Sequence, residues 1–139
     1  MIKILFLCTH NSCRSQMAEG LANHFFGDRV AAFSAGSEAT RLNPLASRVM
    51  TELGIDISRQ RSKTLDAFAG QPFDYVITLC GDANEKCPLF FGGVKRRHLG
   101  IADPSRLPGG DDEVLPEYRR VRDEIKAALG DFFTRELQP

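Results

Sequence analysis

Residues 2–27 read IKILFLCTHNSCRSQMAEGLANHFFG, which is an apolar run, a short polar stretch and then an amphipathic pattern. The apolar run from Ile2 to Leu7 is typical of a strand buried on both faces of a parallel sheet. From Arg14 onwards the apolar residues recur with helical spacing, which predicts a helix that ends at Gly27. The polar stretch therefore joins the carboxyl end of a strand to the amino end of a helix.

Strands and helices alternate through the rest of the chain. Short apolar runs predict strands over residues 30–35, 75–79 and 94–99, and helical patterns cover residues 43–53, 64–69 and 115–137. The last of these strands contains the basic residues 95–98 and is expected at a sheet edge. This order predicts an α/β fold, a single domain over residues 1–139 with a four-stranded parallel sheet flanked by helices.

The composition is that of an ordinary globular domain, with 139 residues of which 42% are hydrophobic. Lysine and arginine together number 18, as do aspartate and glutamate, so the formal net charge is zero. This balance argues against binding to nucleic acid or a membrane surface through bulk charge. No apolar run approaches the about 20 residues of a membrane span, and no secretory signal pattern follows Met1. We therefore expect a cytoplasmic protein with reduced thiols.

The four cysteines fall into two pairs, Cys8 with Cys13 and Cys80 with Cys87. Zinc ribbons and fingers use ligand pairs separated by about two to four residues. Four residues separate the first pair and six separate the second. This spacing argues against a zinc site, and the sequence predicts no bound metal and no cofactor.

The polar stretch has the chemistry of an oxyanion-binding loop. A loop folded around a helix N-terminus directs several backbone N–H groups to one point, where the helix dipole favours negative charge. The residues expected in this loop are Thr9, His10, Asn11, Ser12, Cys13, Arg14 and Ser15. The Arg14 guanidinium can hold two oxygens of a tetrahedral anion. The same field should stabilise a thiolate at Cys8, to whose sulfur the Ser15 hydroxyl could donate a hydrogen bond.

Two further reactive groups follow predicted strands. Cys80 comes directly after the third strand and Asp103 follows the fourth. The carboxyl ends of parallel strands form the rim at which open α/β sheets place their ligands. We therefore expect Cys8, Cys80 and Asp103 to converge there.

The segment from Cys8 to Glu19, CTHNSCRSQMAE, resembles the signature of the thioredoxin-coupled arsenate reductases, which are built on the low-molecular-weight protein tyrosine phosphatase fold. The resemblance covers nearly the whole chain. It continues through residues 34–36, 43–44, 54–58, 78–80, 87–88, 103–104 and 120–125.

The resemblance implies a reaction and the residues that perform it. Cys8 would attack arsenate with Arg14 holding the anion, and Asp103 would protonate the departing oxygen. Cys80 would then attack Cys8 and release arsenite, and Cys87 would attack Cys80. Thioredoxin would reduce the final disulfide, and the enzyme would act as a monomer.

The pairing of Cys80 with Cys87 has a geometric consequence. Two residues seven positions apart in a helix lie about 10.5 Å apart along its axis, whereas a disulfide needs Cα atoms within about 7 Å. The segment between them must therefore unwind or loop out, which predicts a redox-driven change of order. Two alternatives remain. A phosphatase that hydrolyses phosphate monoesters would leave Cys80 and Cys87 spare, and a non-enzymatic anion sensor would need no acid at Asp103.

Some of these reductases hold a potassium ion behind the anion loop, through residues matched here by Asn11, Glu19 and Ser34 together with an aspartate. Lys63 stands where that aspartate would be. We expect its ammonium to occupy the cation position, paired with Glu19. Two loop residues have no assigned chemistry. Cys13 is expected to be a small packing residue, and His10 either assists the anion site or is an exposed loop side chain.

Overall fold

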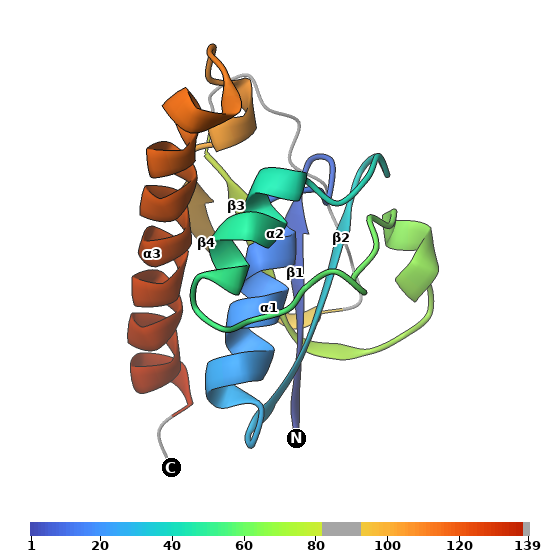
Figure 1. Ribbon diagram of the computed structural model, residues 1–139. Coiled ribbons are helices and arrows are strands. Elements are labelled where there is room, and N and C mark those ends of the chain that lie inside the picture. The colour runs from blue at the N-terminus through green and yellow to red at the C-terminus, as the bar shows by residue number, and fades with distance from the viewer. Residues whose placement is uncertain (82–92, 138–139) are drawn as a thin grey trace.

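A four-stranded parallel sheet forms the centre of the computed structural model, which describes residues 1–81 and 93–137 (Figure 1). The strands are β1 (Ile2–Cys8), β2 (Val30–Gly36), β3 (Phe73–Cys80) and β4 (Gly93–Ile101), in the order β2-β1-β3-β4. The helices are α1 (Arg14–Phe26), α2 (Pro44–Thr51) and α3 (Asp111–Glu136), with short 3₁₀ turns η1 (Leu65–Phe68) and η2 (Pro104–Arg106). The predicted fold class and the edge position of β4 are confirmed.

The strand register brings the functional strand ends to one rim. In the pairing of β1 with β2, Cys8 stands opposite Gly36. In the pairing of β3 with β4, Cys80 stands opposite Ile101, after a register shift between Thr78 and Cys80. The carboxyl ends of all strands therefore lie at the same edge of the sheet.

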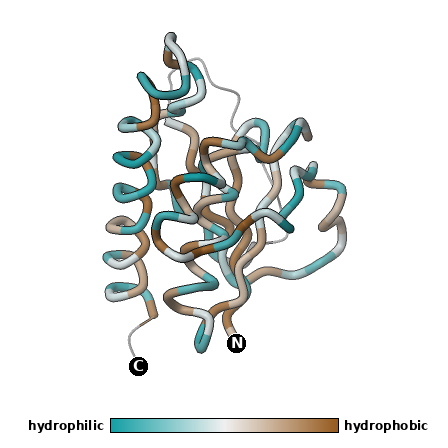
Figure 2. The backbone as a smooth tube through the Cα atoms, in the orientation of Figure 1, coloured by the Kyte–Doolittle hydropathy of each residue, from teal (hydrophilic) through white to brown (hydrophobic). Residues whose placement is uncertain are grey.

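Strand β1 is buried on both faces, as its continuous apolar sequence predicts. Because successive strand residues point to opposite faces, Ile4 and Phe6 join the core shared with α1, α2 and α3. Leu5 and Leu7 join a second, smaller core with Phe68 of η1. Figure 2 shows hydrophobic residues along the central strands, whereas hydrophobic and hydrophilic residues alternate along α3.

Helix α3 begins at Asp111, earlier than the predicted start at residue 115. Its first turn contains Asp111, Asp112 and Glu113, whose negative charge favours a helix N-terminus. Pro116 lies inside the helix. Apolar periodicity alone does not detect this polar first turn, so the helix is longer than the pattern indicated.

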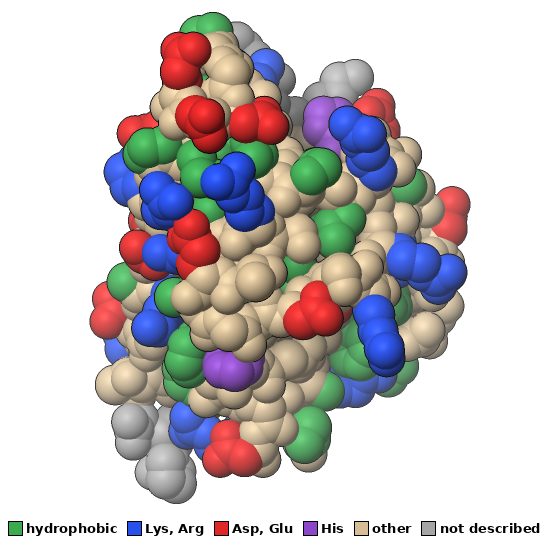
Figure 3. Space-filling model, viewed as in Figure 1, with side chains coloured by type: hydrophobic (Ala, Val, Ile, Leu, Met, Phe, Trp, Pro, Cys, Tyr) green, Lys and Arg blue, Asp and Glu red, His purple; other side chains and the backbone are tan. Residues whose placement is uncertain are grey.

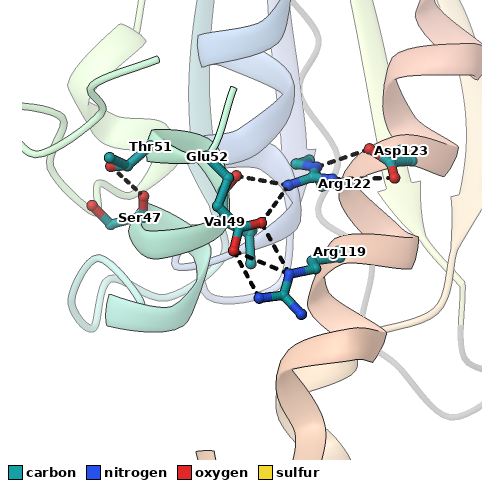
Figure 4. A network of polar contacts seen from close by, with 7 residues as sticks. All are labelled: Ser47, Val49, Thr51, Glu52, Arg119, Arg122 and Asp123. Atoms are coloured by element: carbon teal, nitrogen blue, oxygen red, sulfur yellow. Dashed lines mark hydrogen bonds and ion pairs between the residues drawn. The ribbon is translucent and has the colours of Figure 1, made fainter. Parts of the chain in front are cut away.

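A buried arginine joins α3 to the end of α2 (Figure 4). Nη1 of Arg122 donates to the Val49 carbonyl and to Glu52, both at 2.9 Å. The Arg122 guanidinium also pairs with Asp123 at 2.8 Å. Arg119 holds the same Glu52 carboxylate through Nε and Nη2, and this hydrogen bond keeps the pKa of Glu52 below its ordinary value. The two helices are therefore fixed relative to each other behind the rim.

Both basic and acidic side chains lie on the face seen in Figure 3. None of the helices in the described part of the chain has the length and apolar character needed to cross a lipid bilayer.

Candidate functional site

Residues 9–13 form the loop between β1 and α1. Backbone carbonyl groups of this loop accept hydrogen bonds from residues that surround it. The Thr9 oxygen accepts from the Glu38 N–H at 3.0 Å and from the Ser37 hydroxyl at 3.1 Å. The next carbonyls of the loop are bound in the same way. His10 accepts from the Ser62 hydroxyl at 2.8 Å, Asn11 from the Gln16 amide at 2.9 Å and Ser12 from the Asn43 N–H at 2.8 Å.

These outward hydrogen bonds determine where the N–H groups of the loop point. The described peptide bonds are trans, so the N–H of each peptide unit points opposite to its carbonyl. Anchoring four successive carbonyls outward leaves the N–H groups of residues 10, 11, 12 and 13 directed to the other side of the backbone. Asn11 supports the tight curvature with a left-handed φ of 50°. Consecutive N–H groups of this kind form an anion-binding concavity.

Gly36, the last residue of β2, presses against this loop. A Cβ atom at this position would lie 2.7 Å from the Thr9 oxygen and 2.8 Å from the Cys8 oxygen. Real Cβ atoms do not approach backbone atoms so closely, so only glycine fits here. The end of β2 therefore helps to shape the loop.

The contacts of Asn11 determine the direction of its hydrogen bond to Ser15, whose hydroxyl lies beside Cys8. The Asn11 Oδ1 accepts from the Lys63 N–H at 2.8 Å and from the Gln16 amide at 3.0 Å. Its Nδ2 therefore donates to Ser15 Oγ, at 2.7 Å. Ser15 Oγ lies 2.9 Å from Cys8 Sγ, so the hydroxyl proton of Ser15 is available to this sulfur. A hydroxyl that donates to a cysteine sulfur stabilises the thiolate form in general.

Arg14 connects the loop to the ends of β3 and β4. Its guanidinium is 2% exposed, and Nη1 donates to the carbonyls of Leu79 at 3.2 Å and Ile101 at 2.9 Å. Nη2 lies 3.6 Å from Asp103 Oδ2. Cys80, which follows Leu79, is buried at 6% exposure. The structure therefore brings Cys8, Arg14, Cys80 and Asp103 to the same rim, whereas Cys87 lies outside the described residues.

The Asp103 carboxyl is held at one oxygen and faces Arg14 with the other. Oδ1 accepts from the Ser105 N–H at 3.0 Å and from the Ser105 hydroxyl at 2.7 Å. The side chain is only 9% exposed. Oδ2 is thus directed into the rim, where a proton donor is needed if an oxygen leaves the substrate.

The two loop residues without assigned chemistry differ in their surroundings. Cys13 belongs to the main core, and its pKa is raised by burial and by the charges of Asp103 and Cys8, against the effect of Arg14. A protonated buried thiol is a poor nucleophile. His10 has a side chain that is 45% exposed, with Nε2 at 3.2 Å from Glu38. It is an exposed side chain of the loop paired with a neighbouring loop.

The residues that could hold a cation lie together behind the loop. Ser34 Oγ donates to Glu19 at 2.7 Å, and Lys63 Nζ donates to the Arg61 carbonyl at 2.6 Å. Burial raises the pKa of Glu19, which Ser34 and Lys63 oppose, and burial lowers the pKa of Lys63, which Glu19 opposes. Lys63 therefore interacts with Glu19 electrostatically, and its ammonium donates to the Arg61 carbonyl rather than forming the direct ion pair with Glu19 that we expected.

This arrangement does not fit a potassium ion. The Asn11 oxygen already accepts two N–H donors, and the Lys63 ammonium has the same sign of charge as the ion. Across residues 1–81 and 93–137, no cluster of three or more His, Cys, Asp or Glu side chains could hold a metal.

Several residues that hold the loop were not identified from the sequence. They are Gln16, Gly36, Ser37, Asn43 and Ser62. Gln16 offered one signal, because it is a polar residue beside the core position Met17 and is itself fully buried. Hydrogen bonds made by backbone groups, such as the Asn43 N–H, do not depend on the type of side chain, so they cannot be recognised in the sequence.

Known proteins resemble this chain over nearly its full length. Residues 3–138 match the family described as low molecular weight phosphotyrosine protein phosphatase. An arsenate reductase of Bacillus subtilis (strain 168) is 51% identical over 129 residues, which cover 93% of each chain. An arsenate reductase of Shouchella clausii (strain KSM-K16) is 50% identical over 129 residues, again with 93% of each chain covered.

Solved structures show the same likeness. One is described as an arsenate reductase in the phosphate binding state, with a TM-score of 0.81 and 35% identity over 97% of this chain and 98% of that chain. A second is a thioredoxin-dependent arsenate reductase of Corynebacterium glutamicum, with a TM-score of 0.59 and 32% identity. That alignment covers 92% of this chain and 63% of the other.

Proposed function

The chain belongs to the low molecular weight phosphotyrosine protein phosphatase family, and we propose that within this family it reduces arsenate to arsenite with Cys8 as the nucleophile. The observation that carries the proposal is the second buried thiol, Cys80, at the strand end that Arg14 ties to the anion loop. Hydrolysis of a phosphate ester needs one thiol, whereas reduction by two electrons needs a second. Relatives whose sequences are 50–51% identical to this chain are arsenate reductases.

The first step is attack of the Cys8 thiolate on arsenic. The inward N–H groups of the loop and the Arg14 guanidinium would hold the oxyanion, and the Ser15 hydroxyl supports the thiolate. One arsenate oxygen leaves as water, with a proton from Asp103 Oδ2. The product is a covalent Cys8–arsenic bond in which arsenic is still As(V).

The second step is the reduction. The Cys80 thiolate attacks Cys8 Sγ, the sulfur–arsenic bond breaks, and its electron pair stays on arsenic, which leaves as arsenite. Cys8 and Cys80 are then joined by a disulfide. Cys87 attacks Cys80 and frees Cys8, and thioredoxin takes up the oxidising equivalents by reducing the Cys80–Cys87 disulfide. The roles of Cys87 and thioredoxin rest on the family resemblance and on the thioredoxin-dependent relative.

The alternative is a phosphatase acting on phosphate monoesters. Phosphate has the shape and charge of arsenate, so the same loop, with Cys8 and Asp103, would serve it. Hydrolysis leaves the buried thiol of Cys80 without a role, so we rank it second.

Disulfide mapping tests the relay directly. The reduced protein is incubated with arsenate and its disulfides are identified by mass spectrometry, with phosphate in a parallel incubation as the control. We expect arsenate alone to convert two thiols into a disulfide. Cys80→Ser should stop before arsenite release, and Cys87→Ser should accumulate the Cys8–Cys80 disulfide. An unchanged set of free thiols in the parent protein contradicts reduction, and full turnover by either variant with thioredoxin contradicts the relay.

A further inference from the structure

Asn43 joins the anion loop to two helices. Its backbone N–H donates to the Ser12 carbonyl at 2.8 Å. Its Oδ1 caps α2, accepting from the N–H groups of Leu45 at 2.8 Å and Ala46 at 3.3 Å. Its Nδ2 donates to the hydroxyl of Tyr118 on α3, at 3.0 Å. One residue therefore contacts the loop through its main chain and α3 through its side chain.

The contact with Ser12 controls one anion donor. The Ser12 carbonyl and the Cys13 N–H belong to the same trans peptide unit and point in opposite directions. When Asn43 holds the carbonyl outward, it directs the Cys13 N–H towards the interior of the loop. The orientation of Asn43 thus sets the direction of an N–H group next to the bound anion.

Tyr118 in turn fixes Asn43. The tyrosine is 3% exposed, so its hydroxyl has a defined position in the protein interior. Burial raises the pKa of Tyr118, and the charge of Asp103 adds to this effect, so the phenol interacts electrostatically with a residue of the site. The Asn43 amide opposes the shift through its hydrogen bond.

We propose that Asn43 and Tyr118 are positioning residues for the anion loop, in which the Tyr118 hydroxyl fixes Asn43 and Asn43 directs the Cys13 N–H towards the substrate oxyanion. This inference rests on the proposed function, since it concerns the binding of the same substrate. It adds the N-cap residue of α2 and a residue of α3 to the groups that position the loop.

The chain supplies a matched control, because it has only two tyrosines and both are buried. Tyr75 contacts Glu136 through its hydroxyl at 3.4 Å, far along the sheet from the rim. The test compares Tyr118→Phe with Tyr75→Phe, each of which loses one hydroxyl and keeps the ring. Titration calorimetry measures phosphate binding to the reduced protein, and steady-state kinetics measures arsenate reduction.

We expect Tyr118→Phe to raise the Kd for phosphate and the KM for arsenate about two- to tenfold, the effect of one net hydrogen bond, with little change in kcat. Tyr75→Phe should leave both constants at the parent values. If loss of a buried hydroxyl acted only through general destabilisation, both variants would be affected, and KM would not change independently of kcat. An unchanged phosphate Kd in Tyr118→Phe overturns the proposal.

A double-mutant cycle tests whether Tyr118 acts through Asn43. Asn43→Ser keeps a side chain that can cap α2 and loses the amide that contacts Tyr118. We expect Asn43→Ser to weaken phosphate binding by itself and to make Tyr118→Phe silent when the two are combined. Additive effects overturn the proposed connection. Phosphate binding can be measured without turnover. A parent protein that binds phosphate but does not reduce arsenate would contradict the proposed function. The phosphate Kd values of the variants would still test the positioning role of Asn43 and Tyr118.

Discussion

The Ser15 hydroxyl accepts a hydrogen bond from the Asn11 amide and lies 2.9 Å from Cys8 Sγ. Asn11 is the donor in this first hydrogen bond, because its oxygen accepts from the N–H of Lys63 and the amide of Gln16. The contact between Ser15 and Cys8 could be predicted from the sequence, because the two residues flank one loop. The left-handed backbone of Asn11 was not predicted, although asparagine is one of the non-glycine residues that adopt this conformation most readily.

Cys13 should behave as an inert thiol in the folded protein. Burial raises its pKa, so the thiol stays protonated at a pH at which free cysteine begins to ionise. We expect iodoacetamide at pH 8 to leave Cys13 unlabelled in the native protein and to label it in urea, as measured by mass spectrometry. Equal labelling rates in the two conditions would show that this thiol is accessible and ionised.

The same pKa shift makes stability depend on pH. An unfolded thiol loses its proton above about pH 8.5, whereas folded Cys13 keeps it. The folded state then binds more protons than the unfolded state, so the free energy of unfolding falls as the pH rises. Comparing the parent with Cys13→Ala by urea unfolding at neutral and alkaline pH isolates this contribution.

At the scale of elements, the end of β2 packs directly against the backbone of the anion loop. Gly36→Ala should displace either the strand end or the loop, because its Cβ would meet backbone atoms of residues 8, 9 and 11 at 2.7–2.8 Å. We expect a loss of about 1–3 kcal/mol in unfolding free energy, typical of overpacking, and clearly weaker phosphate binding. Urea denaturation and calorimetry measure the two effects.

Gly130 in α3 provides the comparison for this substitution. Its surroundings leave room for a Cβ, with nothing within 4 Å. Gly130→Ala should therefore stabilise the protein by about 0.5–1 kcal/mol through helix propensity and leave phosphate binding alone. Parent-like phosphate affinity in Gly36→Ala would mean that β2 does not shape the loop.

Most elements could be predicted from the hydrophobic pattern, and the errors have identifiable causes. All four strands were found because buried parallel strands are short apolar runs. Residues 64–69 form a 3₁₀ turn over Leu65–Phe68, since one buried side chain, Phe68, is enough to anchor so short a segment. The start of α3 was missed because its first turn is acidic and precedes the apolar stripe.

At the scale of the whole molecule, the formal net charge is zero, so the proposed binding of an anion depends on local structure rather than on bulk charge. The convergence of Cys8, Cys80 and Asp103 could be predicted, since parallel strands share one rim. The outer supports of the loop could not, because Glu38, Asn43 and Ser62 reach it through tertiary packing. The predicted change of order between Cys80 and Cys87 lies outside the described residues.

The cation position behind the loop leads to a prediction about salts. Because Lys63 and the occupied Asn11 oxygen do not fit potassium, replacing potassium with sodium at fixed ionic strength should leave arsenate reduction unchanged. Values of kcat/KM in the two chlorides provide the measurement. A marked loss of substrate affinity in sodium would mean that a potassium ion binds near Glu19 after all.

Arg14 binds the carbonyls of Leu79 and Ile101 with the same guanidinium that faces the anion site. The outer ends of β3 and β4 therefore cannot open locally without disturbing the arginine, and the arginine cannot leave without releasing them. Strand fraying and loss of the site become one cooperative event. By linkage, an anion bound at the loop would raise the free energy of that opening, so under the proposed function arsenate would protect the strand end that carries Cys80.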